Sequence, residues 1–235
     1  MLSFNSLGKM GRLGNQMFQY AAIFAVARRR GFDFMIPPSS AEDLWVDHQL
    51  FAAFELPGAR YAGFSQGFSQ AQAAGFEYDP VFAETCPDNS DLHGYFQSEA
   101  YFSDAADAVR REFAFRRTTT AEAESLLRAV AGEKISLHVR RGDYLAHADR
   151  HPPCDPDYYA RALKRLPPEL PVVVFSDDIA WCRDHPPFRS DRFVLKQSAS
   201  NIVDLCAMRL CDHHIIRTAA SVGGAPGSAA SRTRL

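Results

Sequence analysis

The chain has 235 residues, 46% of them hydrophobic and 23% charged, which allows one large domain or two smaller ones with buried cores. Its formal net charge of −2 provides no basic surface for a nucleic acid or an anionic membrane. No apolar run approaches the roughly 20 residues that span a bilayer, and the N-terminus lacks a signal-peptide pattern. We therefore expect a cytoplasmic protein whose contact with a membrane, if any, is peripheral.

The five cysteines are odd in number and form no CxxC pair, which argues against a disulfide scaffold. Cys206, Cys211 and the adjacent His213 and His214 carry metal-ligating side chains. Zinc sites favour closer ligand pairs, and neighbouring side chains on a strand point to opposite faces. The sequence therefore predicts no metal site and no resident cofactor.

The first elements along the chain predict a parallel sheet. Residues 2–5 form a candidate strand, a glycine-rich turn follows, and apolar side chains recur at helical spacing over residues 16–30. Gly31 is a helix-stop residue, and FDFMI after it predicts a second strand. A strand, a glycine turn, a helix and a strand make a βαβ unit, in which the two strands run parallel.

Residues 40–95 give no clear elements, but the second half of the chain alternates strands and helices. A helix is expected from Ser103 or Asp104 to Arg111. The later helices are expected at residues 118–132, 155–166, 178–184 and 201–211, and the strands at 134–139, 171–177 and 212–216. The pattern predicts an α/β protein of two halves that meet between residues 116 and 133.

The glycine-rich turn is the first candidate site. Gly8, Gly11 and Gly14 recur every three residues, and Asn15 and Gln16 follow at the start of a helix. Such a turn lets backbone N–H groups approach a phosphate or a sugar. A tight connection between a strand and a helix would need the same glycines, so both interpretations stand.

The segment HVRRGDY is the second candidate site. His138 and Arg140 share one side of a strand, and Arg141, Gly142 and Asp143 form the turn at its carboxyl end. Open α/β sheets bind ligands at this end, and an arginine can offer a planar fork to a diphosphate. Asp143 could orient an arginine or accept a proton. A purely structural Arg–Asp pair is the alternative.

The segment VVVFSDD repeats this arrangement on another strand. An apolar strand delivers Ser176, Asp177 and Asp178 to the same edge of the sheet. The carboxylates could hydrogen-bond a base or a ribose, or they could cap the next helix.

Five segments in order resemble the α-1,2-fucosyltransferases of the glycosyltransferase 11 type: GRLGNQMFQYA, GYFQSEAYF, SLHVRRGDYL, FSDD and DLCAMRLCDHHII. The resemblance runs from about Gly11 to Ile216. It implies a GT-B-like fold of two Rossmann-like halves. It also implies inverting transfer of L-fucose from GDP-fucose to the 2-hydroxyl of a galactoside, without a metal. The partners are then GDP-fucose and a galactose-containing glycan.

The resemblance also assigns roles to residues. Arg140 would hold the donor β-phosphate beside His138, and Ser176, Asp177 and Asp178 would face the nucleotide. Gly14, Asn15 and Gln16 match the N-terminal signature, on the acceptor side. Arg140 and Asp143 are the catalytic candidates, with Asp143 as the proton acceptor. Residues 1–120 would form the acceptor half and residues 130–216 the donor half.

The segment 217–235 differs from everything before it, being rich in Ala, Ser, Gly and Thr. The related enzymes continue at this point with a segment close to ANSSFSWWGAWL, where this chain has RTAASVGGAPGS. The degeneracy of the genetic code allows codons for residues 217–228 that, read one base out of frame, encode NSSFSWWGAWL. This agrees with the segment of the related enzymes at eleven successive positions. A natural disordered tail is the alternative. We expect a one-base frameshift after Ile216.

The frameshift would remove a phosphate-binding loop and buried tryptophans, leaving the second half incomplete. Each buried side chain lost costs roughly 3–5 kcal/mol, against a stability margin of about 5–15 kcal/mol. The chain is therefore predicted to be inactive or poorly folded. The alternatives are a non-catalytic GDP-sugar or glycan-binding remnant, an inert product, and a protein O-fucosyltransferase, whose HxR element is shared.

Overall fold

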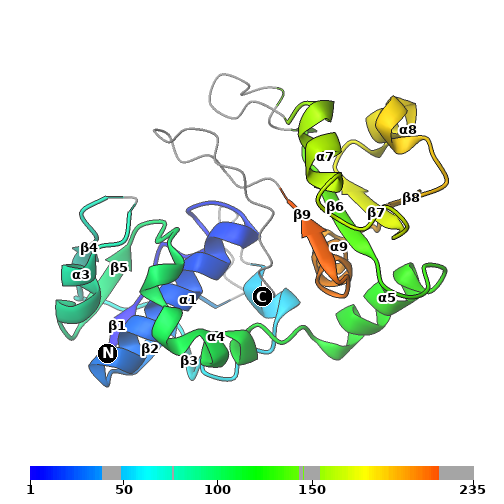
Figure 1. Ribbon diagram of the computed structural model, residues 1–235. Helices are drawn as coiled ribbons and strands as arrows, with labels where there is room; N and C mark the ends of the chain where they lie inside the picture. The colour runs from blue at the N-terminus through cyan, green and yellow to red at the C-terminus, as the bar shows by residue number, and fades with distance from the viewer. Residues whose placement is uncertain (39–48, 76, 143–144, 146–153, 217–235) are drawn as a thin grey trace. The chain divides into compact units, whose positions relative to one another are not determined.

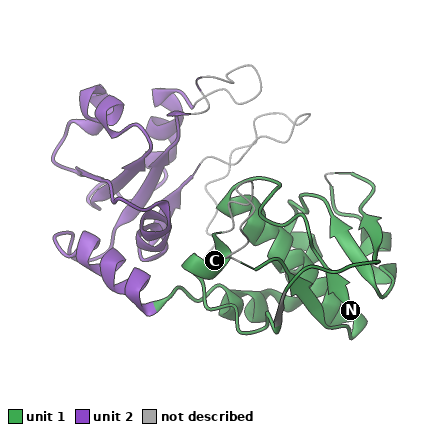
Figure 2. Cartoon of the chain, turned by 180° about the vertical axis from the view of Figure 1, so that it is seen from behind, with its two compact units in different colours: residues 1–116 green, residues 117–235 purple. Residues whose placement is uncertain are grey.

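The computed structural model describes residues 1–38, 49–75, 77–142, 145 and 154–216. The chain divides into two compact units, Met1–Arg116 (unit 1) and Arg117–Leu235 (unit 2) (Figures 1 and 2). Each unit has its own parallel sheet with helices packed on it. The predicted α/β class with two sheet-containing halves is confirmed.

The sheet of unit 1 has five described strands in the order β3-β2-β1-β5-β4. The strands are Leu2–Ser3 (β1), Phe34–Ile36 (β2), Tyr61–Ala62 (β3), Ser69–Gln72 (β4) and Ser90–His93 (β5). The helices are Leu13–Arg30 (α1), Leu50–Ala53 (α2), Pro80–Thr85 (α3) and Ala106–Glu112 (α4), with short 3-10 turns at Glu99–Tyr101 (η1) and Ser103–Ala105 (η2).

Helix α1 is the centre of unit 1, because α2, α3, α4 and η1 all contact it. Its buried Tyr20 donates a hydrogen bond to Glu112 Oε2 at 2.7 Å, and the Gly58 N–H donates to the same oxygen at 2.7 Å. The buried carboxylate of Glu112 is therefore satisfied, and it ties α1, α4 and the segment before β3 together. As predicted, α1 stops at Gly31, which adopts the left-handed conformation (φ 70°).

Unit 2 has four described parallel strands in the order β8-β7-β6-β9. The strands are Ile135–Val139 (β6), Val172–Ser176 (β7), Phe193–Lys196 (β8) and His213–Ile215 (β9). The helices are Arg117–Leu127 (α5), Pro156–Leu163 (α7), Ile179–Asp184 (α8) and Asn201–Arg209 (α9), with a 3-10 turn at Pro186–Phe188 (η3).

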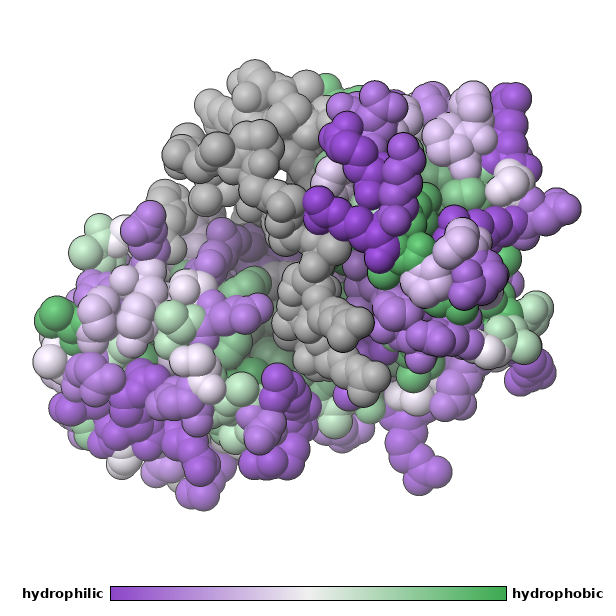
Figure 3. Space-filling view, viewed as in Figure 1, coloured by the Kyte–Doolittle hydropathy of each residue, from purple (hydrophilic) through white to green (hydrophobic). Residues whose placement is uncertain are grey.

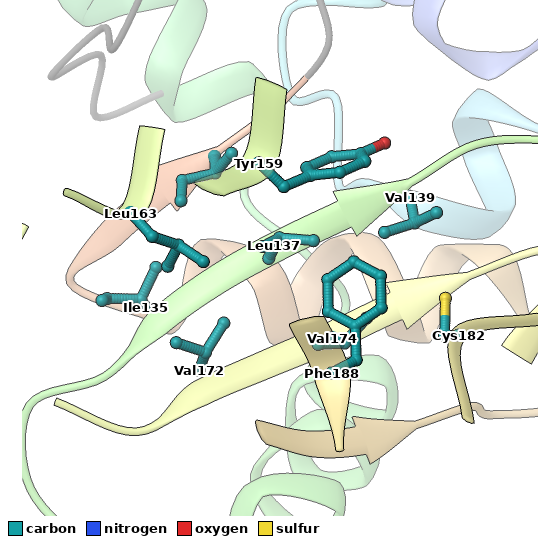
Figure 4. Close-up of a cluster of buried hydrophobic side chains, with 10 residues drawn as sticks. Ile135, Leu137, Val139, Tyr159, Leu163, Val172, Val174, Cys182 and Phe188 are labelled. Atoms are coloured by element: carbon teal, nitrogen blue, oxygen red, sulfur yellow. The ribbon is translucent and has the colours of Figure 1, made fainter. Parts of the chain in front are cut away.

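The core of unit 2 lies between the sheet and the helices that cover it. Leu137 of β6 and Val174 of β7 are fully buried and pack with Tyr159 of α7 and Phe188 of η3 (Figure 4). All five residues of β7 are buried, as expected for a parallel strand covered on both faces. These two strands were predicted from their apolar runs.

The structure differs from the expected elements in several places. The helix expected from Ser103 or Asp104 is divided into η2 and α4, and neither residue caps α4. Helix α5 ends at Leu127, before the predicted stop at Gly132, and strand β8 was not predicted. The strands β3, β4 and β5 and the helix α3 lie in the region that gave no clear elements.

Among the described residues, no helix has both the length and the apolar character needed to cross a membrane. Hydrophilic residues cover much of the face seen in Figure 3, and the exposed apolar residues form small patches.

Candidate nucleotide site at the carboxyl edge of unit 2

The predicted donor residues gather at one edge of the sheet in unit 2. Strand β6 pairs in parallel with β7, and the register places Val139 beside Ser176. The two strands therefore end at the same edge, with Arg140 and Arg141 after β6 and Asp177 and Asp178 after β7. This is the edge at which open parallel sheets bind ligands.

Arg141 links the two strand ends through both its backbone and its side chain. Its N–H donates to Asp177 Oδ1 at 2.8 Å, and its Nε donates to Asp178 Oδ2 at 3.3 Å. Its guanidinium lies 3.9 Å from the ring centroid of Trp181, and only 17% of its side chain is exposed. A cation over an aromatic face contributes about 0.5–2 kcal/mol, depending on desolvation. Arg141 therefore fixes the shape of the edge.

Asp178 is the N-cap of helix α8. Its Oδ1 accepts the N–H of Trp181 at 3.1 Å, and its own N–H donates to Ser176 Oγ at 2.9 Å. The capping alternative of the sequence analysis is thus present in the structure, and Asp178 also pairs with Arg141. Contact of Ser176, Asp177 and Asp178 with a nucleotide stays a prediction.

Gly142 lies at a close approach between the two strand ends. A Cβ at this position would lie 2.8 Å from Asp177 Oδ2, nearer than non-bonded carbon and oxygen atoms normally come. The glycine of the RRGD segment therefore lets the turn after β6 lie against the Asp177 carboxylate.

His138 lies two residues before Arg140, near the end of β6, and is half-buried. Burial lowers its pKa below the ordinary value, and the nearby Arg140 charge lowers it further. Asp177 and Asp204 act in the opposite direction but are weaker influences on the pKa. His138 is therefore neutral at pH 7 and can donate from one ring nitrogen and accept at the other.

Arg140 is half-buried at the carboxyl edge, where a diphosphate would need a planar donor group. Asp143, the predicted proton acceptor, lies outside the described residues. The proposed out-of-frame segment 217–235 also lies outside them.

The glycine-rich turn lies in unit 1, between β1 and α1. Gly11 has φ +90°, and a Cβ there would overlap the side chain of Asn15. The buried Gln16 donates to the Gly11 carbonyl at 3.4 Å and accepts the Gln49 N–H at 3.0 Å. Asn15 accepts from Gln97 Nε2 at 2.5 Å. These contacts match the alternative of a tight structural turn, while Gly14 is exposed in the first turn of α1.

Two residues with structural roles, Gln19 and Trp181, were not predicted from the sequence. Gln19 is fully buried, and its Nε2 donates to the carbonyls of Met10 and Gly94, both at 3.2 Å. Trp181 could have been found through the cap, because an N-cap at Asp178 places residue 181 beside that carboxylate at the third helical position.

In the part of the chain that the structure describes, no three His, Cys, Asp or Glu side chains are grouped to hold a metal ion.

The fold is similar to those of solved structures of the fucosyltransferase NodZ and of POFUT1. The chain matches the fucosyltransferase NodZ from Bradyrhizobium with a TM-score of 0.52 and 14% identity, covering 91% of this chain and 87% of that one. It matches POFUT1 in complex with GDP with a TM-score of 0.58 and 10% identity, covering 91% and 89%. At these identities the matches establish the fold, which is that of GT-B-like glycosyltransferases.

The sequence matches the family described as Glycosyl transferase family 11 over residues 3–223, and the chain belongs to that family. It is 30% identical over 200 residues to galactoside alpha-(1,2)-fucosyltransferase 2 of Oryctolagus cuniculus, covering 77% of this chain and 53% of that protein. It is 31% identical over 134 residues to alpha-1,2-colitosyltransferase of Escherichia coli, covering 52% and 46%. The chain thus spans about half the length of these curated relatives.

The contacts of Arg141 give the first prediction. Arg141→Lys keeps the positive charge but loses the planar group that lies over Trp181, and Asp178 loses its guanidinium partner. We expect unit 2 to lose about 1 kcal/mol of stability. Urea denaturation followed by the fluorescence of Trp181, in a Trp45→Phe background, measures the loss. Arg110→Lys, at an exposed pair with Asp107, is the matched control and should change nothing. An unchanged midpoint in Arg141→Lys would contradict the assigned contacts.

The lowered pKa of His138 gives the second prediction. The unfolded chain binds this proton more readily than the folded one, so unit 2 should lose stability as the pH falls below about 6.5. NMR titration of the imidazole should give a pKa below 6.5. His138→Gln should reduce the pH dependence of unfolding, with the part due to His214, whose pKa is also lowered, remaining. A His138 pKa at or above the ordinary value would contradict the prediction.

Proposed function

We propose that this family member is built to transfer L-fucose from GDP-fucose to the 2-hydroxyl of a galactoside, with inversion at the sugar carbon. Unit 2 would hold the donor and unit 1 the acceptor. The observation that carries the proposal is that β6 and β7 end at the same edge of the sheet. Arg140, which follows β6, is therefore at the same edge as the residues that follow β7. The names of the relatives support the substrate class.

The chemistry requires a group that stabilises the leaving GDP. As the bond from the fucose carbon to the phosphate oxygen breaks, negative charge grows on the β-phosphate. Arg140 would stabilise this charge with its guanidinium, and a fixed donor of this kind contributes several kcal/mol to a reaction of this type. The neutral His138 beside it would add a hydrogen-bond donor. Arg141, held by Asp178 and Trp181, would keep the edge in shape.

Asp143 is our proposed proton acceptor from the attacking hydroxyl. It follows the RRG turn directly and so belongs to the loop that begins at the carboxyl edge of β6. Ser176 and Asp177 are proposed to contact the nucleotide.

We further propose that the 235-residue chain is inactive because its gene, or the reported sequence of its gene, is frameshifted after Ile216. Strand β9 pairs in parallel with β6, with Leu137 beside Ile215. The chain therefore leaves β9 at the edge where the donor would bind, and a sequence change at this point would replace residues close to the phosphates. The hydroxyl of Tyr158 donates to the Ile216 carbonyl at 2.8 Å, which anchors the last described residue.

The third prediction concerns activity. The 235-residue chain should give no fucosylated product with GDP-fucose and a β-galactoside. A gene with one base inserted before the Arg217 codon, and with the downstream sequence translated in the restored frame, should give a chain that forms this product. In that restored chain, Arg140→Lys should lower kcat/KM by about 100-fold, as loss of a fixed charge-stabilising donor does. Arg110→Lys is the matched control.

Different results would contradict the separate proposals. Robust turnover by the 235-residue chain would refute its inactivity, and codons that cannot be regrouped into NSSFSWWGAWL would refute the frameshift. A restored chain that folds but neither binds GDP nor transfers fucose would refute the function.

A further inference from the structure

The sheet of unit 1 has one face covered by helices, and the opposite face is polar along β5 and β4. Phe34 of β2 packs on Tyr20 and Phe24 of α1, with ring centroids 5.8 and 6.1 Å apart, so it faces the helices. The register pairs Phe34 with Leu2, and Leu2 with Ser90. These residues share the covered face, and because side chains alternate along a strand, Ser3 and Asp91 point to the other face.

The exposure of β4 and β5 shows that this second face is not packed like a core. In β5, Ser90 and Leu92 are buried while Asp91 and His93 are half-buried, and both glutamines of β4, Gln70 and Gln72, are exposed. Parallel strands are normally covered on both faces and are apolar throughout, as β7 is in unit 2. Strand β4 lies at the edge of the described sheet, where polar side chains are common, so this part of the face presents accessible polar groups rather than a packed core.

Asp91 lies at the centre of this face and has one oxygen held in place. Its Oδ1 accepts the Ser3 hydroxyl at 2.8 Å and the Asn5 N–H at 2.8 Å. No donor among the described residues lies within hydrogen-bonding distance of the other oxygen, Oδ2. The carboxylate is thus oriented by the protein with one acceptor atom still available.

His93 lies two residues further along β5, on the same side. Its Nδ1 is 3.4 Å from Ser6 Oγ, and within the described ranges Nε2 has no partner. The register places Gln72 beside His93 and Gln70 beside Asp91. The face therefore presents a carboxylate oxygen, an imidazole nitrogen and two amides.

An exposed aromatic residue belongs to a segment that is hydrogen-bonded to Ser3 and Asn5, the two residues that hold Asp91. The Ser65 N–H donates to Asn5 Oδ1 at 3.0 Å, and Asn5 Nδ2 donates to Ser65 Oγ at 2.9 Å. Ser3 Oγ and Ser65 Oγ are also 2.6 Å apart. These bonds hold the segment that carries Phe64, whose side chain is 46% exposed.

We propose that this face, made of Phe64, Gln70, Gln72, Asp91 and His93, is the binding site of a neutral glycan acceptor. A sugar offers hydroxyls that both donate and accept hydrogen bonds, which suits amides, an imidazole and one carboxylate oxygen. It also offers an apolar C–H face that can pack on an aromatic ring. The five residues include no lysine or arginine, so they do not suit a phosphate.

This proposal rests on the proposed function, in which unit 1 holds a galactoside. It goes further by assigning the acceptor to side chains on the sheet face and on the loop at Phe64, rather than to the glycine-rich turn.

The fourth prediction tests this site on the full chain by NMR titration with methyl β-galactoside. Asp91→Asn keeps an oxygen to accept from Ser3 and Asn5 but replaces the available oxygen with an NH2 group. We expect the Kd to rise at least fivefold in Asp91→Asn and at least threefold in Phe64→Ser. Val81→Ser removes an exposed apolar side chain from α3 of the same unit (68% exposed) and should leave the Kd unchanged.

A parallel titration with GDP separates the two proposals. GDP affinity should be equal in all these variants, since none of them changes unit 2. Unchanged galactoside affinity in both Asp91→Asn and Phe64→Ser, with each variant shown to be folded by circular dichroism, would overturn the site. So would a chain that binds GDP but no galactoside. Binding of the galactoside at this face without binding of GDP would support the site, and the same GDP titration on the frame-restored chain would then separate an effect of the frameshift from a failure of the proposed function.

Discussion

The interaction on which the candidate donor site depends is the fixing of Arg141 between two strand ends. Its backbone N–H binds Asp177, its guanidinium binds Asp178, and the same guanidinium lies over Trp181. Asp178 in turn caps α8, so the turn after β6 and the start of α8 form one connected piece. These bonds hold the backbone directly after Arg140. Charge stabilisation is effective only when the charged group is already in position, so in the proposed function Arg141 would help to position Arg140.

The two parallel sheets of the protein differ in where their polar side chains lie. In unit 2 the strand β7 is buried at every position, and side-chain chemistry is confined to the carboxyl edge, where the strands stop. In unit 1 the strands β4 and β5 alternate, and polar groups lie on a face of the sheet as well as at its end. An edge of short turns with an arginine suits a compact charged group such as a diphosphate. A face of amides, an imidazole and a carboxylate, with the exposed Phe64 on a segment bonded to it, would suit a neutral sugar.

The sequence predicted those elements whose signals are local. Apolar runs identified β6 and β7, helical spacing and Gly31 delimited α1, and the parallel order of the strands placed Arg140 and Asp177 at one edge. It could not choose between capping and binding for Asp178, because the same carboxylate geometry serves both. It missed β3 and β4, which are two and four residues long. The polar β4 lacks the apolar stripe that marks a core strand. Gln19 was missed because its role is to join turns that are far apart in the sequence.

The central claim is that the carboxyl edge of β6 and β7 binds the nucleotide. Hydrogen–deuterium exchange of the full chain, with and without GDP, tests it most directly. We expect slower exchange at residues 139–142 and 176–178 in the presence of GDP, and unchanged exchange along β4 and β5 of unit 1. Protection confined to unit 1, or none at residues 139–142 under conditions in which GDP binds, would contradict it.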